Sequence, residues 1–364
     1  MTHIAVFISP HGFGHAARVS AIMTALAEIE PQLEFDIFTL VPEWFFRDFA
    51  AFQFNYFPLN TDIGFIQSSA FVEDIPQTLT AIDALIPFRQ EQVSVLANLI
   101  LSRDCRLVLC DIAPLGIQVA ETANIPSVLI ENFTWDWIYQ GYLQEAPELK
   151  KSIDYLSGIF SRATHHIQTE PAHSQWKYSL RTNPVSNKPR TAPEQIRNQL
   201  GILPDKKWVL ISMGGILQNI PHVERLTELE NIQVVMLCAL EEQKREGNLI
   251  LYPHHTSIYH PDLVHAADAV IGKVGYSTVA EVYHAGVPFG CVLRPRFPEN
   301  EILRQFLAQN TPVEFFSPET FESGQWIDRI PALVQRPKVP RSNIINGSRQ
   351  AAEYLYRVLL DTAE

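Results

Sequence analysis

The sequence IGKVGYSTVAE at residues 271–281 begins at the end of an apolar run that is typical of a buried strand. Two glycines then turn the chain into a predicted helix, which has Ser277 and Thr278 at or near its first residue. Such a helix start leaves several backbone N–H groups unpaired at the positive end of the helix dipole. Helix ends of this kind bind phosphate groups.

Glu281 lies three or four residues into this predicted helix, so its carboxylate can face the same way as the open helix end. A diphosphate on the N–H groups and a ribose on the carboxylate is the simplest ligand that fits both features. An ordinary strand, turn and helix with a capping-box glutamate explains the same residues equally well. The stretch therefore raises a nucleotide-binding hypothesis without deciding it.

The length and composition indicate a globular protein of two domains. A chain of 364 residues is long for a single hydrophobic core, and 46% apolar with 19% charged residues is ordinary for a globular protein. The formal net charge is −12, and residues 1–185 carry 10 Lys and Arg against 20 Asp and Glu. This acidic half argues against nucleic acid and against an anionic membrane surface as partners.

Four cysteines, at positions 105, 110, 238 and 291, show no metal-ligand spacing, as expected for free thiols in a reducing compartment. The first residues predict a strand and lack the pattern of a secretion signal. No apolar run approaches the roughly 20 residues that a membrane-spanning helix needs. We therefore expect a cytoplasmic protein without a transmembrane segment.

The N-terminal residues have the order strand, glycine loop, helix, strand, at residues 4–9, 10–15, 16–29 and 35–40. This order opens a doubly wound α/β domain. The second half begins similarly, with an apolar strand at 208–212. We expect an N-terminal domain at 1–183 and a C-terminal domain at 184–342, with a C-terminal helix at 343–364 that packs back on the first domain.

The loop after the first predicted strand is a second candidate site. Gly12 and Gly14 let the backbone pass close to a ligand, and open α/β sheets bind ligands at this strand end. His15 starts the helix, and a histidine with a pKa of about 6.5 suits proton abstraction at neutral pH. The alternative for His15 is a hydrogen bond to the backbone, and His11 is interpreted as a solvated or capping residue.

Other strand ends offer further pocket candidates. Asp111 ends a predicted strand and is interpreted either as a pocket residue or as a helix cap. Asn132, Trp135 and Asp136 follow the strand at 126–130, and core packing explains most of the aromatic rings there, with acceptor contact as the alternative. The aromatic tract at 44–57 is likewise interpreted as core packing.

Five stretches in order along the chain resemble the GT-B glycosyltransferases: HGFGHAAR (11–18), NFTWDWIY (132–139), LISMGG (210–215), GKVGYSTVAE (272–281) and RPRFPENE (294–301). Together they are similar to the glycosyltransferase-like N-terminal region of plant L-arabinokinases. A more distant similarity is to the enzyme that adds N-acetylglucosamine during peptidoglycan precursor synthesis. The resemblance implies two Rossmann-like, doubly wound domains that face a cleft.

The resemblance also implies roles for individual residues. His15 corresponds to the catalytic or acceptor-facing histidine, and Asp111 is our second catalytic candidate. Asn300 and Glu301 fall, with Glu299, where many relatives hold the donor sugar with an acidic residue and a glutamine, but the glutamine is absent here. The full set expected to contact the nucleotide-sugar donor is Gly12, Gly14, Gly214, Gly215, Tyr259, Lys273, Gly275, Tyr276, Ser277, Thr278, Glu281, Arg294, Asn300 and Glu301.

The implied reaction is inverting transfer of a sugar from a nucleotide sugar, as a family expectation a UDP-sugar, to an unidentified hydroxyl acceptor. The sequence contains no Asp-x-Asp triplet, so we expect neither a dedicated metal nor another cofactor. Two alternatives remain open. One is a nucleotide-sugar-binding module without activity, motivated by the missing glutamine and by the kinase linkage of the relatives. The other is an epimerase that uses Asp111, Glu131 and Asp136.

Overall fold

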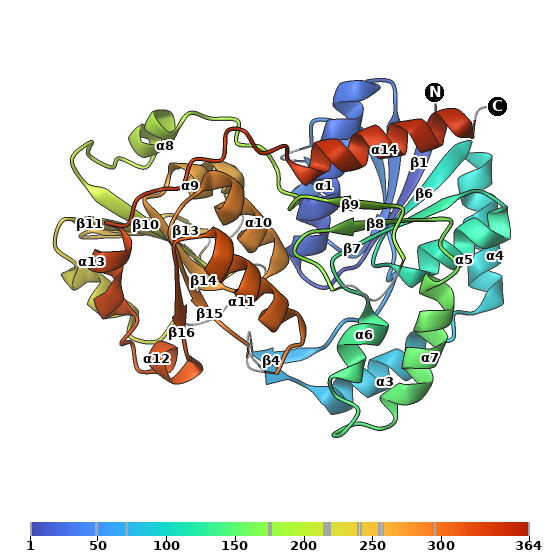
Figure 1. Cartoon of the computed structure of the whole chain (residues 1–364), viewed down its shortest axis with the longest axis horizontal. Helices are drawn as coiled ribbons and strands as arrows, with labels where there is room; N and C mark the ends of the chain where they lie inside the picture. Colours follow the sequence, from blue (N-terminus) through green and yellow to red (C-terminus); the bar gives the residue numbers. More distant parts are fainter. Residues whose placement is uncertain are drawn as a thin grey trace.

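The structure is a computed structural model, and it describes residues 2–362 except 48–49, 70–71, 174–176, 214–219, 239, 241, 254–255, 257 and 295. Two seven-stranded sheets form the centres of two α/β halves that lie side by side (Figure 1). The expected fold class, with two doubly wound domains, is confirmed. Among the described residues, no helix combines the length and the apolar character needed to cross a membrane.

The first sheet has the order β3-β2-β1-β6-β7-β8-β9, and its strands are parallel. These strands are β1 His3–Ile8, β2 Glu34–Thr39, β3 Gln53–Pro58, β6 Cys105–Asp111, β7 Ser127–Glu131, β8 His165–Thr169 and β9 Leu180–Thr182. The chain winds outward from β1 to β3 and returns to the other side of β1 with β6. The carboxyl ends of β1 and β6 are therefore the switch point where such sheets bind ligands.

Helices cover both faces of this sheet, and a two-stranded hairpin lies beyond it. The segments are α1 Phe13–Ile29, α2 Trp44–Arg47, β4 Gln67–Ser69, β5 Val72–Glu73, α3 Ile75–Leu85, α4 Gln90–Ser102, α5 Pro114–Ala123, α6 Trp135–Gln140 and α7 Leu149–Phe160. Alternate residues of β1 enter different cores: Phe7 packs in the core that includes α4 and α5, and Val6 in the core that includes α1. The first helix begins at Phe13, three residues before its expected start.

The second sheet has the order β12-β13-β11-β10-β14-β15-β16, and its strands are parallel except for β12. Its strands are β10 Lys207–Ser212, β11 Ile232–Cys238, β12 Lys244–Glu246, β13 Leu249–Pro253, β14 Ala269–Lys273, β15 Phe289–Val292 and β16 Val313–Phe316. The winding reverses between β10 and β14. The second switch point therefore lies at Ser212 and Lys273, the last residues of these two strands.

The helices of this half are α8 Pro193–Gln199, α9 His260–Ala266, α10 Tyr276–Ala285, α11 Glu299–Asn310, α12 Pro318–Glu322 and α13 Ile330–Leu333, with 3₁₀ turns at Val223–Glu228 and Ile327–Arg329. Helix α10 lies at the boundary between the halves. Its Tyr276 and Ala280 belong to the core cluster that also contains α1. The helix that follows the glycine turn after β14 therefore makes contact between the two halves.

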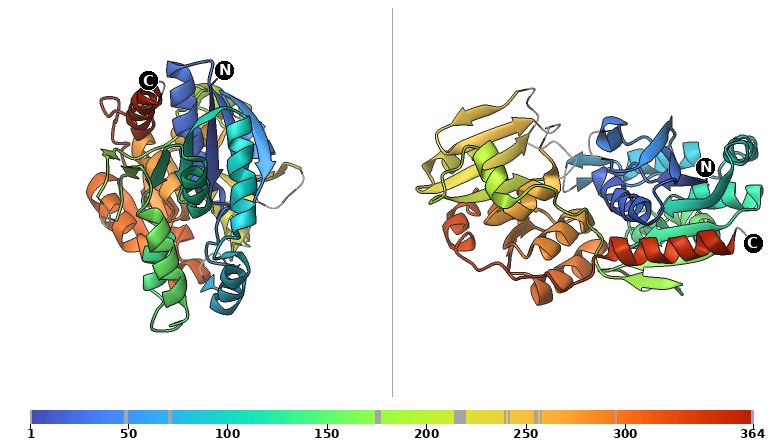
Figure 2. Two further views of the ribbon diagram at one scale, coloured as in Figure 1. Left: turned by 90° about the vertical axis from the view of Figure 1, so that its right-hand side faces the viewer. Right: turned by 90° about the horizontal axis from the view of Figure 1, so that it is seen from above.

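The last helix, α14 Gly347–Asp361, returns to the first half and lies against α1 (Figure 2). Ala351, Leu355 and Val358 of α14 are buried in the core that includes α1. The helix begins four residues later than expected, because Asn346 caps it by accepting a hydrogen bond from the Ser348 N–H. The chain thus crosses between the halves twice, once before the strands of the second sheet and once after them.

Candidate functional site

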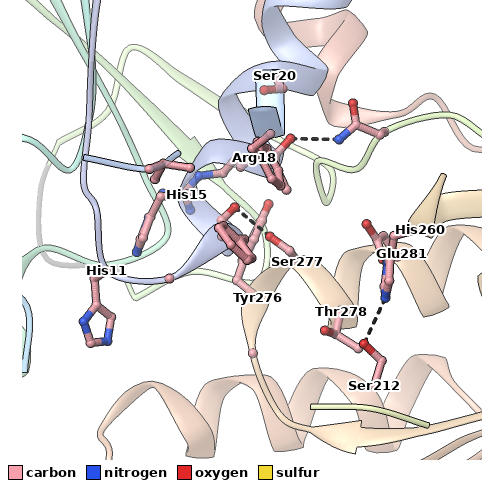
Figure 3. Close-up of a pocket in the computed structure, with 18 of the residues that line it drawn as sticks. His11, His15, Arg18, Ser20, Ser212, His260, Tyr276, Ser277, Thr278 and Glu281 are labelled. Atoms are coloured by element: carbon pink, nitrogen blue, oxygen red, sulfur yellow. Dashed lines mark hydrogen bonds and ion pairs between the residues drawn. The ribbon is translucent and has the colours of Figure 1, made fainter. Parts of the chain in front are cut away.

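A cavity of about 630 Å³ lies between the two halves (Figure 3). The first half contributes the loops that follow β1 and β2. The second half contributes the β14–α10 turn, the start of α9 and the loop after β15. The carboxyl ends of both switch points open into this cavity, and its volume lies within the range of small-molecule sites, about 300–1,000 Å³.

The N-terminus of α10 borders the cavity. Gly275 precedes the helix, and Tyr276, Ser277 and Thr278 form its first turn. Within the described part of the chain, the N–H groups of these three residues make no hydrogen bond outside the helix. The Ser277 hydroxyl donates to the carbonyl oxygen of Gly14 at 2.7 Å. The helix start therefore contacts the first half through a side chain while its backbone donors stay available.

Two cationic side chains flank this helix start. Lys273 ends β14, and Arg294 follows β15; both line the cavity. Burial, helped by the charge of Arg294, lowers the pKa of Lys273 to about 8. The Arg294 guanidinium lies 3.7 Å from the centre of the Phe297 ring and 3.9 Å from the carboxylate of Glu299. This corner of the cavity is electropositive and favours an anionic ligand.

Glu299 connects the two halves. Its Oε1 accepts a hydrogen bond of 2.7 Å from the side-chain amide of Asn132 in the first half. Burial raises the pKa of the Glu299 carboxyl, although the charge of Arg294 and the Asn132 hydrogen bond oppose this effect. Glu299 lines the cavity and so stands between the cations and the first half.

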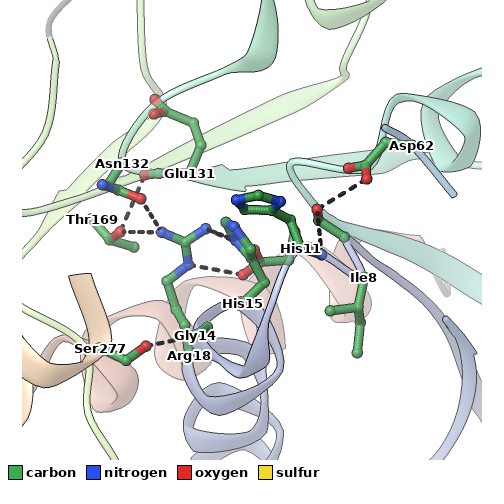
Figure 4. Close-up of polar contacts among 12 residues, drawn as sticks. Ile8, His11, Gly14, His15, Arg18, Asp62, Glu131, Asn132, Thr169 and Ser277 are labelled. Atoms are coloured by element: carbon green, nitrogen blue, oxygen red, sulfur yellow. Dashed lines mark hydrogen bonds and ion pairs between the residues drawn. The ribbon is translucent and has the colours of Figure 1, made fainter. Parts of the chain in front are cut away.

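A buried network centred on Arg18 lies on the opposite wall (Figure 4). The Arg18 guanidinium donates to both carboxylate oxygens of Asp111, at 2.8 and 2.7 Å, and to the side-chain oxygen of Asn132 at 2.5 Å. Its carbon Cζ lies 4.9 Å from the centre of the Tyr276 ring. Burial alone would raise the pKa of Asp111, but the charge and hydrogen bonds of Arg18 outweigh burial and hold this pKa below its ordinary value.

His15 is oriented by the same carboxylate. Its Nδ1 lies 2.9 Å from Oδ1 of Asp111, which can only accept, and 3.3 Å from Nη2 of Arg18, which can only donate. The contact with Asp111 is the shorter one and decides the tautomer. Nδ1 therefore carries the proton, and Nε2 of the neutral ring is an unprotonated acceptor. His15 lines the cavity, whereas Asp111 is completely buried behind it. The pair can act as a general base, with Asp111 orienting the imidazole.

His11 differs from its sequence interpretation. It is partly buried, lines the cavity and contacts the Trp135 ring edge-on, with ring centres 5.0 Å apart. Burial lowers the pKa of His11 well below its ordinary value.

Trp135 also donates to Asp62 at 3.1 Å. Asp62 gave no signal in the sequence, because it lies in an irregular stretch without periodicity.

Ser212, His260 and Glu281 form a chain of hydrogen bonds on the second-half wall. The Ser212 hydroxyl lies 3.0 Å from Nε2 of His260, and Nδ1 of His260 lies 2.9 Å from Oε2 of Glu281. All three side chains line the cavity (Figure 3). The sequence analysis missed Ser212 and His260. Their only signal was position, since one ends a strand and the other begins a helix before Pro261.

Part of the aromatic tract lines the cavity, which corrects the interpretation of that tract as core. Phe13 stacks on Phe45 with ring centres 5.3 Å apart, and Trp44 contacts Phe13 edge-on at 5.5 Å. These rings are partly exposed, whereas Phe46 is buried beneath them, and the neighbouring Leu40 is 51% exposed. We call Phe13, Leu40, Trp44 and Phe45 the apolar lobe.

Most of the expected donor contacts meet at the cavity: Gly12, Gly14, Tyr259, Lys273, Gly275, Tyr276, Ser277, Thr278, Glu281 and Arg294 line it. Gly214 and Gly215 lie outside the described residues. Asn300 is buried and donates to the Arg294 carbonyl, and it does not line the cavity. Glu301 needs correction: it is exposed on α11 and pairs with Arg304. Helix α11 begins at Glu299, so Glu301 faces away and Glu299 occupies the wall.

The remaining candidates lie behind the lining. Asn132, Trp135 and Asp136 are buried and do not line the cavity. Glu131, proposed for an epimerase, pairs with His166 at 2.7 Å and is also absent from the lining. In the part of the chain that the structure describes, no three His, Cys, Asp or Glu side chains are grouped so that they could hold a metal ion.

Comparisons with known proteins agree with this geometry. No protein-family model matches the chain. The L-arabinokinase of Arabidopsis thaliana is 27% identical over 96% of the chain, and the chain spans 34% of that protein's length. The UDP-N-acetylglucosamine–N-acetylmuramyl-(pentapeptide) pyrophosphoryl-undecaprenol N-acetylglucosamine transferase of Bacillus licheniformis is 23% identical, over 67% of the chain and 69% of its own length. The resemblance inferred from the five stretches is confirmed by these relatives.

Solved structures share the arrangement of both halves. The spinosyn forosaminyltransferase SpnP matches with a TM-score of 0.65 at 15% identity, over 100% of the chain and 99% of its own. The MurG protein of Acinetobacter baumannii matches with a TM-score of 0.56 at 15% identity, over 99% and 100%. The chain has the GT-B fold. A third GT-B structure, UGT89C1 of Arabidopsis thaliana complexed with UDP, matches with a TM-score of 0.59 at 12% identity, over 100% of both chains.

Proposed function

We propose that this protein is an inverting, metal-independent glycosyltransferase that uses a nucleotide-sugar donor. The observation that carries the proposal is the position of the His15–Asp111 pair across one cavity from the N-terminus of α10. A proton acceptor and an anion-binding helix end, facing the same space, are what displacement from a nucleotide sugar requires. The glycosyltransferases among the relatives support the reaction class.

The donor's diphosphate would bind at the start of α10. The N–H groups of Ser277 and Thr278 and the ammonium of Lys273 would meet its oxygens, with Arg294 nearby. Glu281, one turn into the helix, would accept hydrogen bonds from the ribose. We propose UDP as the nucleotide, and the UDP in the complex of UGT89C1 supports that choice.

The chemical step would be a single displacement. Nε2 of His15 takes the proton of the acceptor hydroxyl while its oxygen bonds to the anomeric carbon from the face opposite the diphosphate. The bond from that carbon to the diphosphate oxygen breaks, and the configuration inverts. Negative charge develops on the leaving diphosphate, where the helix N–H groups and Lys273 stabilise it. The proton remains on His15, paired with Asp111.

The acceptor would occupy the apolar lobe beside the loop that carries His15. Its rings and Leu40 expose apolar surface toward the cavity, and an apolar molecule gains from covering such surface. We therefore propose an acceptor that combines a hydroxyl group with an apolar, ring-bearing body.

The experiment uses His15→Ala with matched binding and transfer assays. Release of UDP from a panel of UDP-sugars is measured with hydroxyl acceptors of different polarity, and UDP affinity is measured by calorimetry. We expect the variant to retain UDP affinity within about twofold and to lose at least about 10²-fold in turnover, which is the effect of a general base. Wild-type protein that binds UDP-sugars without transferring or hydrolysing them would instead support a binding module.

A further inference from the structure

The hydrogen-bonded chain of Ser212, His260 and Glu281 joins three separate elements of the second half. Ser212 ends β10, His260 begins α9, and Glu281 lies in the second turn of α10. The two links are 3.0 Å, between the Ser212 hydroxyl and Nε2, and 2.9 Å, between Nδ1 and Oε2 of Glu281 (Figure 3). Both ring nitrogens of His260 are therefore engaged.

The direction of the link to Glu281 does not depend on the protonation state of His260. A carboxylate can only accept, so Nδ1 donates to Oε2 whether the ring is neutral or charged. In the neutral ring, Nε2 accepts from the Ser212 hydroxyl, which fixes that tautomer. Burial lowers the pKa of His260, but the charge of Glu281 and their hydrogen bond raise it by more, so the net pKa is above its ordinary value.

The second carboxylate oxygen of Glu281 is left for a ligand. Oε1 makes no hydrogen bond among the described residues, whereas Oε2 is held by His260. The Glu281 side chain lines the cavity next to Thr278, in the helix whose first N–H groups are available. The hydrogen bond to Oε2 restricts rotation of the carboxylate, and Oε1 is the oxygen that remains available to a ligand.

We propose that Ser212 and His260 form a relay that holds Glu281 in position to accept hydrogen bonds from the ribose hydroxyls of a nucleoside diphosphate. This inference rests on the proposed nucleotide site and adds two positioning residues to it. Glu281 contacts the ribose; His260 and Ser212 act through Glu281. The relay makes the site selective for a ribonucleotide over its 2′-deoxy analogue, which lacks one donor for Oε1.

The same order of atoms occurs in hydrolases, where a serine hydroxyl is the nucleophile of a Ser–His–carboxylate triad. The exposures argue against that role here. Ser212 is only 4% exposed, whereas the His260 side chain is 33% exposed. A nucleophile must meet its substrate directly, yet the serine is the least accessible of the three groups. The arrangement fits support of Glu281 better than attack by Ser212.

The test compares ribo- and 2′-deoxyribonucleotides. Calorimetry gives the affinity of wild-type protein for UDP, GDP and ADP, and then for the 2′-deoxy form of the tightest binder. The variants are His260→Ala, Ser212→Ala and His260→Asn, whose amide N–H can replace Nδ1–H. Thermal melting of each variant shows whether it is folded, and the donor KM and kcat are measured where transfer is detected.

We expect wild-type protein to prefer the ribonucleotide about tenfold, the value of one hydrogen bond to a charged acceptor. His260→Ala should lose most of this preference while its affinity for the deoxynucleotide changes less than about twofold. His260→Asn should restore part of the preference, and Ser212→Ala should lower it. In turnover, His260→Ala should raise the donor KM and leave kcat nearly unchanged, a pattern that a general loss of structure would not produce.

Three outcomes would overturn the relay. Equal losses of affinity for ribo- and deoxynucleotide in His260→Ala, with Lys273→Met still weakening both, would reject the relay and leave the nucleotide site standing. Failure of all three wild-type nucleotides to bind would reject the nucleotide site and the relay together. Hydrolysis of p-nitrophenyl acetate that disappears in Ser212→Ala would show that the serine acts as a nucleophile instead.

Discussion

The side-chain amide of Asn132 donates a 2.7 Å hydrogen bond to Glu299, joining residues 167 positions apart across the base of the cavity. Both side chains are buried. Asn132 also accepts from Arg18, so the network behind His15 continues into the half that carries the cations. One amide side chain therefore links the two walls of the site, so that displacement of either hydrogen-bond partner changes the position of Asn132 for the other.

Replacing Asn132 with alanine tests this coupling. Asn132→Ala leaves Glu299 buried without its donor and Arg18 with one hydrogen bond fewer. We expect the free energy of unfolding to fall by about 1–3 kcal/mol, the penalty for a buried polar group that loses its partner. Urea unfolding at neutral pH measures the change. Asn198→Ala, at an exposed position of α8, is the control for loss of an amide outside the cavity, and no measurable loss in Asn132→Ala would contradict the coupling.

Replacing Asp111 with asparagine tests the catalytic pair. Asp111→Asn keeps the size of the side chain but removes the carboxylate that accepts from Nδ1 of His15 and fixes its tautomer. We expect kcat to fall by about 10³-fold while UDP affinity changes little, because Asp111 lies behind His15 and does not line the cavity. Steady-state kinetics and calorimetry measure both quantities on protein shown to be folded. Unchanged kcat would remove Asp111 from the mechanism.

The lowered pKa of Lys273 predicts a pH dependence of donor binding. In the free protein its pKa is about 8, so the ammonium loses its proton as the pH rises through 8. A bound diphosphate favours the charged form, so binding takes up a proton above this pH. The affinity for UDP should therefore fall above about pH 8, by at most about tenfold per pH unit.

Calorimetry with UDP from pH 7 to 10 measures this dependence. Lys273→Met is the matched control, because it keeps the length of the side chain and removes the titrating group. The variant should bind more weakly at pH 7 and should lack the decrease above pH 8. A decrease of the same size in Lys273→Met would assign the titration to another group.

The apolar lobe predicts the behaviour of an apolar acceptor. Trp44→Ala removes the ring that contacts Phe13 and lines the cavity. Binding of the planar phenol 4-methylumbelliferone, followed by fluorescence, should weaken by up to about tenfold, since one aromatic contact contributes about 0.5–1.5 kcal/mol. Trp44→Phe should lose less. UDP affinity should stay constant in both variants, and a parallel loss of UDP binding would mean that the lobe belongs to the donor site.

Local patterns predicted the framework of the site well. The apolar run, glycine turn and helix at residues 267–285 were correctly interpreted because each signal lies within a few residues. Asp111 was assigned to the end of one strand, and His15 to the helix start that follows the loop after another. Parallel strands bring such ends to one edge, so the two residues meet although 96 positions separate them. The assignment of catalytic roles to them remains a prediction.

Contacts between the halves could not be predicted in this way. The bonds of Asn132 to Glu299 and of Ser277 to Gly14 depend on how the two sheets face each other, which no local pattern encodes. The phase of α11 decides that Glu299 and not Glu301 faces the cavity, and an error of two residues at a helix start reverses this outcome. Composition likewise did not separate the partly exposed rings of Phe13 and Trp44 from Phe46, which borders the same cavity but is buried.

The most direct test of the account is a crystal structure of the complex with UDP. We expect the diphosphate oxygens to lie within hydrogen-bond distance, about 2.7–3.2 Å, of the N–H groups of Ser277 and Thr278 and of Nζ of Lys273. The imidazole of His15 should face the open end of that diphosphate. A diphosphate bound elsewhere, with the α10 N-terminus covered by protein, would contradict the central claim.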